Sequence, residues 1–166
     1  MGITAPEILN DEHALSKFSC GIQALDDWFL KQAIKSQKRN NAKVYVVTDS
    51  FTEQVIGYYA IAMGSVQREN AIASLRRNSP NPIPMVVLAR LAVHKNYHGK
   101  GIGVGLLKDC IRHSVHAMNV VGGAGILVHA IDESAKSFYS KFGFTESTFD
   151  GMMLMASIRG IEKAKI

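Results

Sequence analysis

Cysteine is scarce in this sequence of 166 residues, which contains only Cys20 and Cys110. Two cysteines are too few for a disulfide framework. The sequence also has no CxxC pair and no cluster of cysteines and histidines with the spacing of a metal site. We therefore expect both thiols to be reduced and no metal to be bound.

Long apolar runs are missing as well. No stretch approaches the roughly 20 apolar residues that cross a bilayer, and residues 1–7 lack the basic and apolar regions of a signal peptide. We expect a cytoplasmic protein that does not enter a membrane. Repeats, low-complexity tracts and Gly/Ser linkers are also absent, so the length suits a single domain over residues 1–166.

Acidic residues are rare in the middle of the chain. Residues 28–108 carry 12 lysines and arginines against 3 acidic residues, whereas the rest of the chain carries 7 against 11. A basic middle between acidic ends suggests a polyanionic partner. A basic coenzyme site explains part of the asymmetry, and an evenly solvated surface is the alternative interpretation.

Hydrophobic periodicity predicts alternating helices and strands. Leu25, Phe29 and Ala33 recur every four residues and indicate one helix over 22–38, while residues 67–84 look irregular and end in a proline-rich segment. Further helices are expected at 101–118 and 132–142, the latter capped by Asp132. The expected strands are 42–48, 54–66, 85–93, 124–131, and an antiparallel pair at 144–148 and 152–158. This order predicts a mixed α/β (α+β) sandwich with a mixed sheet rather than a doubly wound parallel sheet.

A glycine-rich segment, HGKGIGVG at residues 98–105, separates the apolar strand 85–93 from an amphipathic helix. Glycines there let the backbone approach a ligand, and the free N–H groups of the helix start suit a pyrophosphate. A dinucleotide-binding motif would need an acidic residue about 20 positions on, after a second strand, and no acidic residue lies between Asp109 and Asp132. A P-loop would need Gly-Lys-Ser/Thr, which is also missing.

Three segments in order resemble motifs of the GNAT acetyltransferases: LARLAV at 88–93, HKNYHGKGIGVGLL at 94–107 and AKSFYSKFGF at 135–144. This resemblance implies a GNAT fold, with splayed central strands flanked by helices, and acetyl-coenzyme A as cofactor. One departure is His98, which stands where the family usually has Gln or Arg. Because backbone N–H groups bind the pyrophosphate, we expect this change to be tolerated. The implied coenzyme-binding residues are Leu91, Ala92, Val93, His98, Gly99, Lys100, Gly101, Ile102, Gly103 and Phe138.

Tyr139 is the implied catalytic residue, because the family uses a tyrosine at this place to protonate the departing coenzyme A thiolate. The competing interpretation is that Tyr139 and Phe138 only pack under the sheet. His94, His98 and His129 are possible bases, each of which also fits a surface or core-edge position.

The chain resembles one group of GNAT proteins more closely, namely the toxins of bacterial type II toxin–antitoxin systems. The similar segments are FSCG at 18–21, VIGYYAIAMGSV at 55–66, the Asn/Pro-containing stretch 77–84 and GMMLM at 151–155. Members of this group acetylate the α-amine of aminoacyl-tRNA and are restrained by a ribbon-helix-helix antitoxin. The resemblance therefore implies aminoacyl-tRNA as substrate, such an antitoxin as partner, and a homodimer.

The basic residues fit a tRNA partner, although each of them singly also fits a solvated surface. Spacing on the expected helix 22–38 places Lys31, Lys35 and Lys38 on one face, and Arg90 is expected to face the active-site cleft. The candidate tRNA-binding residues are Lys31, Lys35, Lys38, Arg39, Arg76, Arg77 and Arg90.

The acceptor itself needs little help from the enzyme. A free α-amine titrates near about 7.7–8.0 and a lysine near about 10.4. Esterification of the carboxyl should lower the pKa of the α-amine further, so much of it is neutral at cellular pH and a dedicated base is not essential. Two other functions stay open at this point: acetylation of a small-molecule amine or a protein N-terminus, and a non-catalytic module that binds coenzyme A or nucleic acid.

Overall fold

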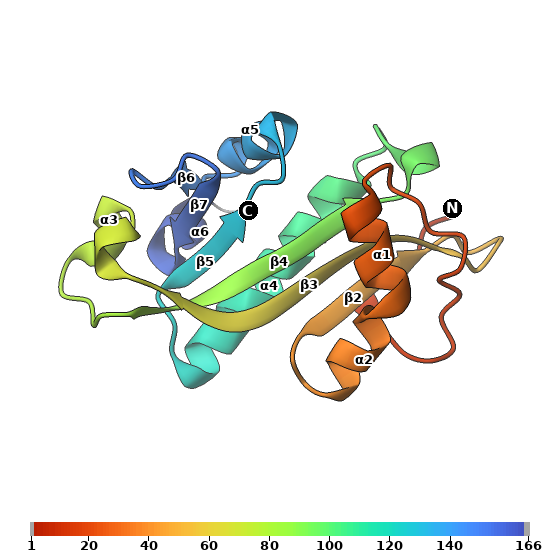
Figure 1. The fold of residues 1–166 in the computed structure, drawn as a ribbon, viewed down its shortest axis with the longest axis horizontal. Helices are drawn as coiled ribbons and strands as arrows, with labels where there is room; N and C mark the ends of the chain where they lie inside the picture. The colour runs from red at the N-terminus through yellow and green to blue at the C-terminus, as the bar shows by residue number, and fades with distance from the viewer. Residues whose placement is uncertain (1, 165–166) are drawn as a thin grey trace. The chain divides into compact units, whose positions relative to one another are not determined.

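A computed structural model describes residues 2–164, which fall into two compact units (Figure 1). Unit 1 contains the described residues up to Ala62 together with Arg90–Cys110, and unit 2 contains Met63–Ala89 and the described residues from Ile111 onward. Three elements run from one unit into the other: β3 (Val55–Val66), β4 (Ile83–Val93) and α4 (Ile102–Val121). The expectation of a single domain over residues 1–166 stays a prediction.

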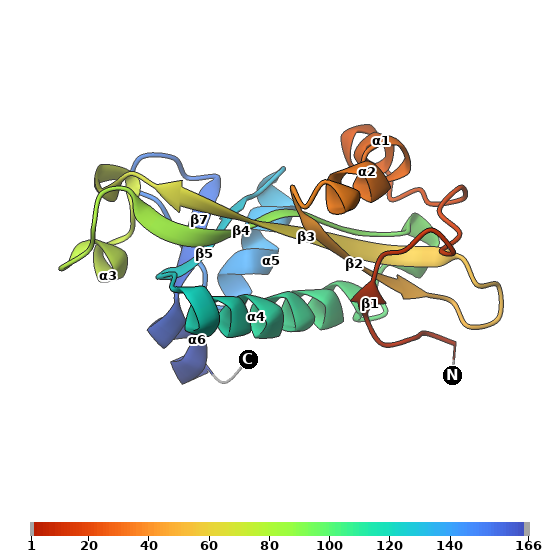
Figure 2. The same ribbon diagram turned by 90° about the horizontal axis from the view of Figure 1, so that it is seen from below.

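The sheet of unit 1 begins with three antiparallel strands in the order β1 (Glu7–Ile8), β2 (Lys43–Thr48) and β3, followed by the end of β4. Helices α1 (Gln23–Lys31) and α2 (Ala33–Lys38) cover one face of β2 and β3, and the first half of α4 covers the other (Figure 2). Neighbouring side chains of β3 explain this layering, because successive residues of a strand point to opposite faces. Tyr58 stacks on Phe29 of α1 with ring centroids 4.2 Å apart.

Gly57, the residue before Tyr58, lets α4 approach β3 closely. A Cβ at this position would lie 3.0 Å from Leu106 of α4 and 3.0 Å from Val47 of β2. The absent side chain therefore sets the distance between α4 and β3, and with it the position of the start of α4 in unit 1.

The single helix predicted over 22–38 is wrong, because the chain breaks at Gln32 (φ −120°, ψ −25°) into α1 and α2. Phe29 and Ala33, on either side of the break, are both fully buried. Gln37 then holds α2 to the sheet, since its side chain accepts a hydrogen bond from Val44 N–H at 2.7 Å and donates one to Leu9 O. Sequence periodicity does not register such a break, since the apolar spacing continues across it.

The sheet of unit 2 contains the end of β3, the start of β4, then β5 (Gly125–His129), β7 (Met153–Ser157) and β6 (Thr145–Glu146). The β4–β5 pair is parallel, with Met85 opposite Gly125 and Leu88 opposite Val128, and the others in the order β5-β7-β6 are antiparallel. Helix α5 (Glu133–Lys141) starts at Asp132, whose carboxylate accepts from Ala135 N–H at 2.8 Å as expected for the cap. The mixed α+β architecture predicted from the element order is confirmed.

Unit 2 also contains elements that the sequence analysis did not predict. Residues 67–84, expected to be irregular, include the 3₁₀ turn η1 (Arg68–Asn70) and the short helix α3 (Ala73–Arg76), whose Leu75 is buried. The last element of the described residues is the helix α6 (Ile158–Ala164). The expected strand 144–148 shrinks to β6. The next residue, Ser147, still donates its backbone N–H to Met153 O at 2.8 Å, and its hydroxyl donates to Asn70 O at 2.7 Å. Among the described residues, no helix has the length and apolar character to cross a membrane.

Both cysteines are buried, and neither forms a disulfide. Burial and the nearby Asp26 carboxylate raise the pKa of Cys20 to about 11. Since only the thiolate is nucleophilic, iodoacetamide should alkylate native Cys20 at pH 8 at least about 100-fold more slowly than a free cysteine of pKa about 8.5. The rate should rise with pH toward 11, and unfolding in guanidinium should abolish the protection. Peptide mass spectrometry reads both cysteines separately, and fast native alkylation of Cys20 at pH 8 would contradict this assignment.

Candidate active site

Strand β4 leads directly into the glycine-rich turn in unit 1. The parallel ladder with β5 covers Met85–Leu88, whereas β4 itself continues to Val93. On the β3 side, His94 N–H donates to Ile56 O at 2.7 Å. Ala92 is buried in the core of unit 1, while Leu91 and Val93 are half-buried. The last residues of β4 are therefore held in place by unit 1.

The glycine-rich turn adopts a backbone conformation that favours glycine. After the 3₁₀ turn η2 (Lys95–Tyr97), Gly99 and Gly101 adopt φ of 78° and 80°. A Cβ at either position would meet no atom within 4 Å, so both glycines are required for the left-handed conformation and not for space. The space beside Gly99 and Gly101 is therefore open, as a ligand at the turn would require.

The turn ends at the N-terminus of α4, where N–H groups converge. Gly105 N–H donates to Gly101 O at 3.1 Å, which closes the first turn of the helix. The N–H groups of Ile102, Gly103 and Val104 precede this bond and have no acceptor within the helix, since an α-helix pairs each N–H with the carbonyl four residues back. With the positive end of the helix dipole, they form an anion-binding site that fits a diphosphate.

The two polar side chains of the turn, His98 and Lys100, make contacts that do not suit a general acid or base. His98 turns back toward β4, and because a carbonyl only accepts, its Nε2–H donates to Val93 O at 2.7 Å. The Lys100 ammonium lies 5.8 Å from the centre of the Tyr97 ring. His98 thus braces the turn, which is consistent with a site in which the backbone binds the anion.

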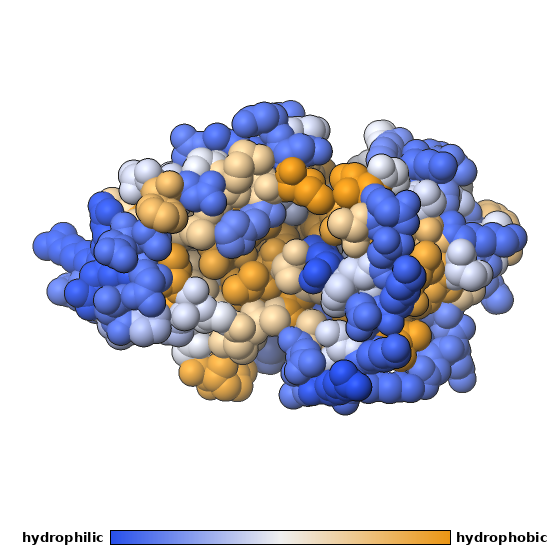
Figure 3. All heavy atoms as spheres, viewed as in Figure 1, coloured by the Kyte–Doolittle hydropathy of each residue, from blue (hydrophilic) through white to orange (hydrophobic). Residues whose placement is uncertain are grey.

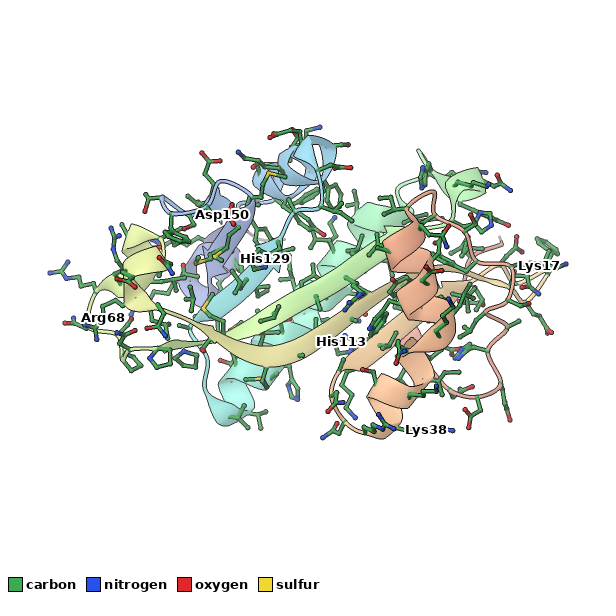
Figure 4. The ribbon with its side chains drawn as sticks, in the orientation of Figure 1. Lys17, Lys38, Arg68, His113, His129 and Asp150 are labelled. Carbon is green, nitrogen blue, oxygen red and sulfur yellow. The ribbon has the colours of Figure 1, made fainter. Side chains whose placement is uncertain are left out.

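Tyr139 lies in α5 of unit 2 and is buried, with 6% of its surface exposed. Its ring meets Phe138 and Phe144 edge to face, with centroids 5.2 Å and 5.8 Å apart. Phe138 is half-buried. The aromatic contacts hold the Tyr139 ring, as the packing interpretation expects. His129, another candidate base, is exposed at the end of β5 (Figure 4).

The candidate tRNA-binding residues of unit 1 do not form the single helical face that was predicted. Lys31 ends α1, and Lys35 and Lys38 belong to α2, so the break at Gln32 separates them. All three are exposed, as is Arg39, but the Lys38 ammonium also lies 3.1 Å from the Asp11 carboxylate (Figure 4). Arg90 is half-buried and stacks over Trp28, with the guanidinium carbon 4.3 Å from the ring centre. Sequence analysis missed this cation–π pair, because Trp28 and Arg90 are far apart in the chain.

In unit 2, Arg76 and Arg77 are exposed at the end of α3. The segment η1–α3, residues 68–77, presents a hydrophilic surface at the left of Figure 3. Arg68, which the sequence analysis did not select, also belongs to this segment. The Arg68 guanidinium donates to Ser79 O at 2.5 Å, and the Arg68 backbone N–H donates to Asn81 Oδ1 at 3.0 Å. Within residues 2–164, no group of three or more His, Cys, Asp or Glu side chains is placed to hold a metal ion.

Comparison with known proteins adds a family to this geometry. The acetyltransferase (GNAT) domain family matches residues 40–146. The tRNA-acetylating toxin of Mycobacterium tuberculosis is 37% identical over 93% of this chain and 92% of its own. The structure of AtaT complexed with acetyl-methionyl-tRNAfMet matches with a TM-score of 0.89 at 27% identity, covering 99% of both chains. A tyrosine-to-phenylalanine variant of the AtaT toxin, bound to the C-terminus of the antitoxin AtaR and to acetyl-CoA, matches with a TM-score of 0.83 at 27% identity over 98% of both chains.

Proposed function

The chain belongs to the acetyltransferase (GNAT) family, and from this membership we propose that it is a toxin that transfers an acetyl group from acetyl-coenzyme A to the α-amine of aminoacyl-tRNA and so blocks translation. The observation that carries the proposal is the 37% identity to a tRNA-acetylating toxin over 93% of this chain. The likeness to AtaT, whose structure was solved with acetyl-methionyl-tRNAfMet, supports the same acceptor.

The family motifs select the coenzyme-binding residues, and the geometry of the turn supports those that lie in it. The N–H groups of the turn from His98 to Gly103 bind the pyrophosphate, with Lys100 adding positive charge. Main-chain groups of Leu91, Ala92 and Val93 bind the pantetheine arm, and Phe138 contacts the same coenzyme. When bound, acetyl-coenzyme A supplies a thioester carbonyl that an amine attacks. The positive φ angles of Gly99 and Gly101 and the free N–H groups of the α4 N-terminus fit this assignment.

Tyr139 supplies the proton that the leaving group, the thiolate of coenzyme A, takes up. The attacking amine forms the new C–N bond, the C–S bond breaks, and the Tyr139 hydroxyl gives its proton to the departing sulfur. The amine attacks in its neutral form, which is accessible because esterification of the carboxyl lowers its pKa below the about 7.7–8.0 of a free α-amine. After attack the nitrogen gives its extra proton to solvent, and solvent returns a proton to Tyr139. The aromatic contacts that fix the Tyr139 ring support this role, because a general acid must be held in one orientation.

The tRNA contacts fall on both units. Arg76 and Arg77 of unit 2 are exposed and bind phosphates, and Arg90 acts from its position over Trp28 in unit 1. The remaining assigned residues of unit 1 are Lys31, Lys35, Lys38 and Arg39. Phosphate contacts of this kind add affinity without reading sequence, so they suit a substrate recognised mainly by its end.

The proposed partners come from the resemblance to the GNAT toxins of type II toxin–antitoxin systems. A ribbon-helix-helix antitoxin restrains the toxin in the cytoplasm, and two copies of the chain form a homodimer. Support for an antitoxin partner comes from AtaT, which was solved with the C-terminus of AtaR. Co-expression that restores growth, and size-exclusion chromatography with light scattering of the isolated toxin, test the two assemblies separately.

The acceptor is identified by isotope labelling. Purified protein is incubated with charged tRNA and acetyl-coenzyme A that carries a heavy acetyl group, and the amino acids released from the RNA are analysed by mass spectrometry. We expect the heavy acetyl group on the α-amine of the esterified amino acid. If the heavy acetyl group instead appeared on free amines or protein N-termini and the RNA stayed unlabelled, the alternative acetyltransferase activity would replace this function.

Reversing two charges on the η1–α3 segment tests whether the acceptor is a polyanion. In Arg76→Glu/Arg77→Glu we expect KM for charged tRNA to rise about 10- to 100-fold, because two attractions to phosphate become repulsions. The plot of log affinity against log salt should lose about two units of slope. The matched control Arg159→Glu/Lys163→Glu makes the same change in net charge on exposed residues of α6. Equal effects of the two double variants would show that only net charge matters and would remove Arg76 and Arg77 from the tRNA site.

A further inference from the structure

Phe149 is the most exposed aromatic side chain of unit 2 among the described residues, with 73% of its surface in solvent. It lies between β6 and β7, in the segment 147–152, which we call the β6–β7 loop. Its neighbours Glu146 and Thr148 are exposed and polar. A single ring among polar residues lacks the area of a stable protein interface, which needs about 800 Å² from each partner. One flat ring does suit stacking on another flat group.

The β6–β7 loop is held in shape at both of its sides. Ser147 is buried, and its hydroxyl donates to Asn70 O at 2.7 Å and accepts from Phe149 N–H at 3.1 Å. On the same side, directly before Ser147, the Glu146 carboxylate lies 2.5 Å from the Lys136 ammonium of α5. The Asp150 carboxylate closes the turn by accepting from Met152 N–H at 2.9 Å. Because the backbone on either side of the ring is already ordered, binding to the ring loses little conformational entropy.

The bond from Ser147 to Asn70 joins the β6–β7 loop to the basic η1–α3 segment. Asn70 is the last residue of η1, and the same segment carries Arg68, Arg76 and Arg77. Figure 4 labels Arg68 and Asp150, which come from these two segments of unit 2. An exposed aromatic ring beside a group of arginines is the arrangement that binds single-stranded nucleic acid, with phosphates on the cations and bases on the ring.

The charges near Phe149 disfavour the phosphate of a nucleotide at the ring but not its base. Asp150 follows the ring directly and repels phosphate, whereas a base is neutral and is not repelled. The Glu146 carboxylate is neutralised by Lys136, whose own pKa is raised by this pairing. The arginines of the η1–α3 segment therefore take the phosphates, and the ring takes a base.

We propose that Phe149 is a stacking platform for an unpaired base at the end of the RNA substrate, with the arginines of the η1–α3 segment binding the neighbouring phosphates. This inference rests on the proposed function and names the part of the RNA that unit 2 recognises. Stacking needs a base that is free of its own helix, so the platform selects RNA with a single-stranded end over fully paired RNA.

Three substitutions of Phe149 separate stacking from simple apolar contact. We expect Phe149→Ala and Phe149→Leu to raise KM for charged tRNA about 5- to 150-fold, the range seen when one base–aromatic stack is lost. Phe149→Tyr should keep the wild-type KM, because it keeps the ring face. KM for acetyl-coenzyme A should be unchanged in all three. The matched control is Phe51→Ala, which removes another exposed phenylalanine, 85% in solvent, from the loop between β2 and β3 of unit 1.

A binding measurement without turnover gives a second, independent reading. An RNA hairpin with an unpaired 3′ end and the same hairpin with a blunt end are titrated against wild type and Phe149→Ala. We expect the substitution to weaken binding of the first hairpin only. Equal binding of both hairpins by both proteins, or a Leu variant that behaves like wild type, overturns the platform. A change in oligomeric state of Phe149→Ala with unchanged RNA affinity assigns the ring to a contact between copies and also overturns it. If wild type acetylates no charged tRNA, the proposed function fails instead, whatever the hairpins show.

Discussion

Replacing Tyr139 by phenylalanine is expected to lower kcat for acetyl transfer by about 10²- to 10⁴-fold, the usual contribution of a general acid. Phenylalanine keeps the edge-to-face contacts with Phe138 and Phe144 and removes only the hydroxyl that gives its proton to the coenzyme A thiolate. KM for acetyl-coenzyme A and the melting temperature should change little. Growth arrest on expression should disappear together with activity. Single-turnover kinetics with acetyl-coenzyme A and charged tRNA measure the chemical step directly.

The matched control for this prediction is Tyr58→Phe in unit 1, which also removes one buried phenol hydroxyl. That hydroxyl donates to Leu25 O at 2.8 Å. Losing it should cost about 1 kcal/mol of stability and leave kcat close to that of wild type. Full activity in Tyr139→Phe would show that Tyr139 only packs against its aromatic neighbours, and another group would then have to supply the proton.

Replacing Gly101 by valine should weaken acetyl-coenzyme A binding by about 10- to 100-fold, which corresponds to the loss of one hydrogen bond to a charged group. Gly101 has φ of 80° directly before α4. A β-branched residue avoids this region of backbone space, so the turn shifts and its N–H groups no longer converge on the pyrophosphate. Because a Cβ here meets no atom within 4 Å, the effect comes from the backbone and not from a clash. Isothermal titration calorimetry with coenzyme A measures the change.

The control for backbone strain is Gly122→Val. Gly122 has φ of 92° and follows the other end of α4, and a Cβ there also meets nothing within 4 Å. Both variants should lose similar stability, but only Gly101→Val should lose coenzyme affinity. Equal coenzyme affinity in the two variants would mean that the turn does not bind the pyrophosphate.

Local patterns accounted for the elements whose reasons are themselves local. The cap at Asp132, the glycine-rich turn before α4 and the strands β2, β3, β5 and β7 all depend on residues within a few positions of each other. The prediction of a mixed α+β fold and the membership of the GNAT family came from the order and spacing of such segments. The assignments of Tyr139 and of the turn to particular roles stay predictions, which the two substitutions above test.

The failures share one cause, which is a contact with a distant segment. The first helix breaks at Gln32, and the Gln37 side chain of the second piece accepts from Val44 N–H of β2. The segment 67–84 forms η1 and α3 because its apolar residues, such as Leu75, join a core cluster with residues of β4, β5 and β7. Neither effect changes the hydropathy pattern of the segment concerned, so periodicity alone does not reveal it.

By itself, then, the sequence determined most of the strands, the helices α4 and α5, the glycine-rich turn before α4, and the family to which the motifs belong. Only the tertiary structure decided that Lys31 is separated from Lys35 and Lys38 by a helix break, that Arg90 stacks over Trp28, and that Ser147 ties the loop of Phe149 to the arginines of η1–α3. The physical reason is range: backbone propensity acts between neighbours in the chain, whereas packing and side-chain hydrogen bonds act between residues that only folding brings together.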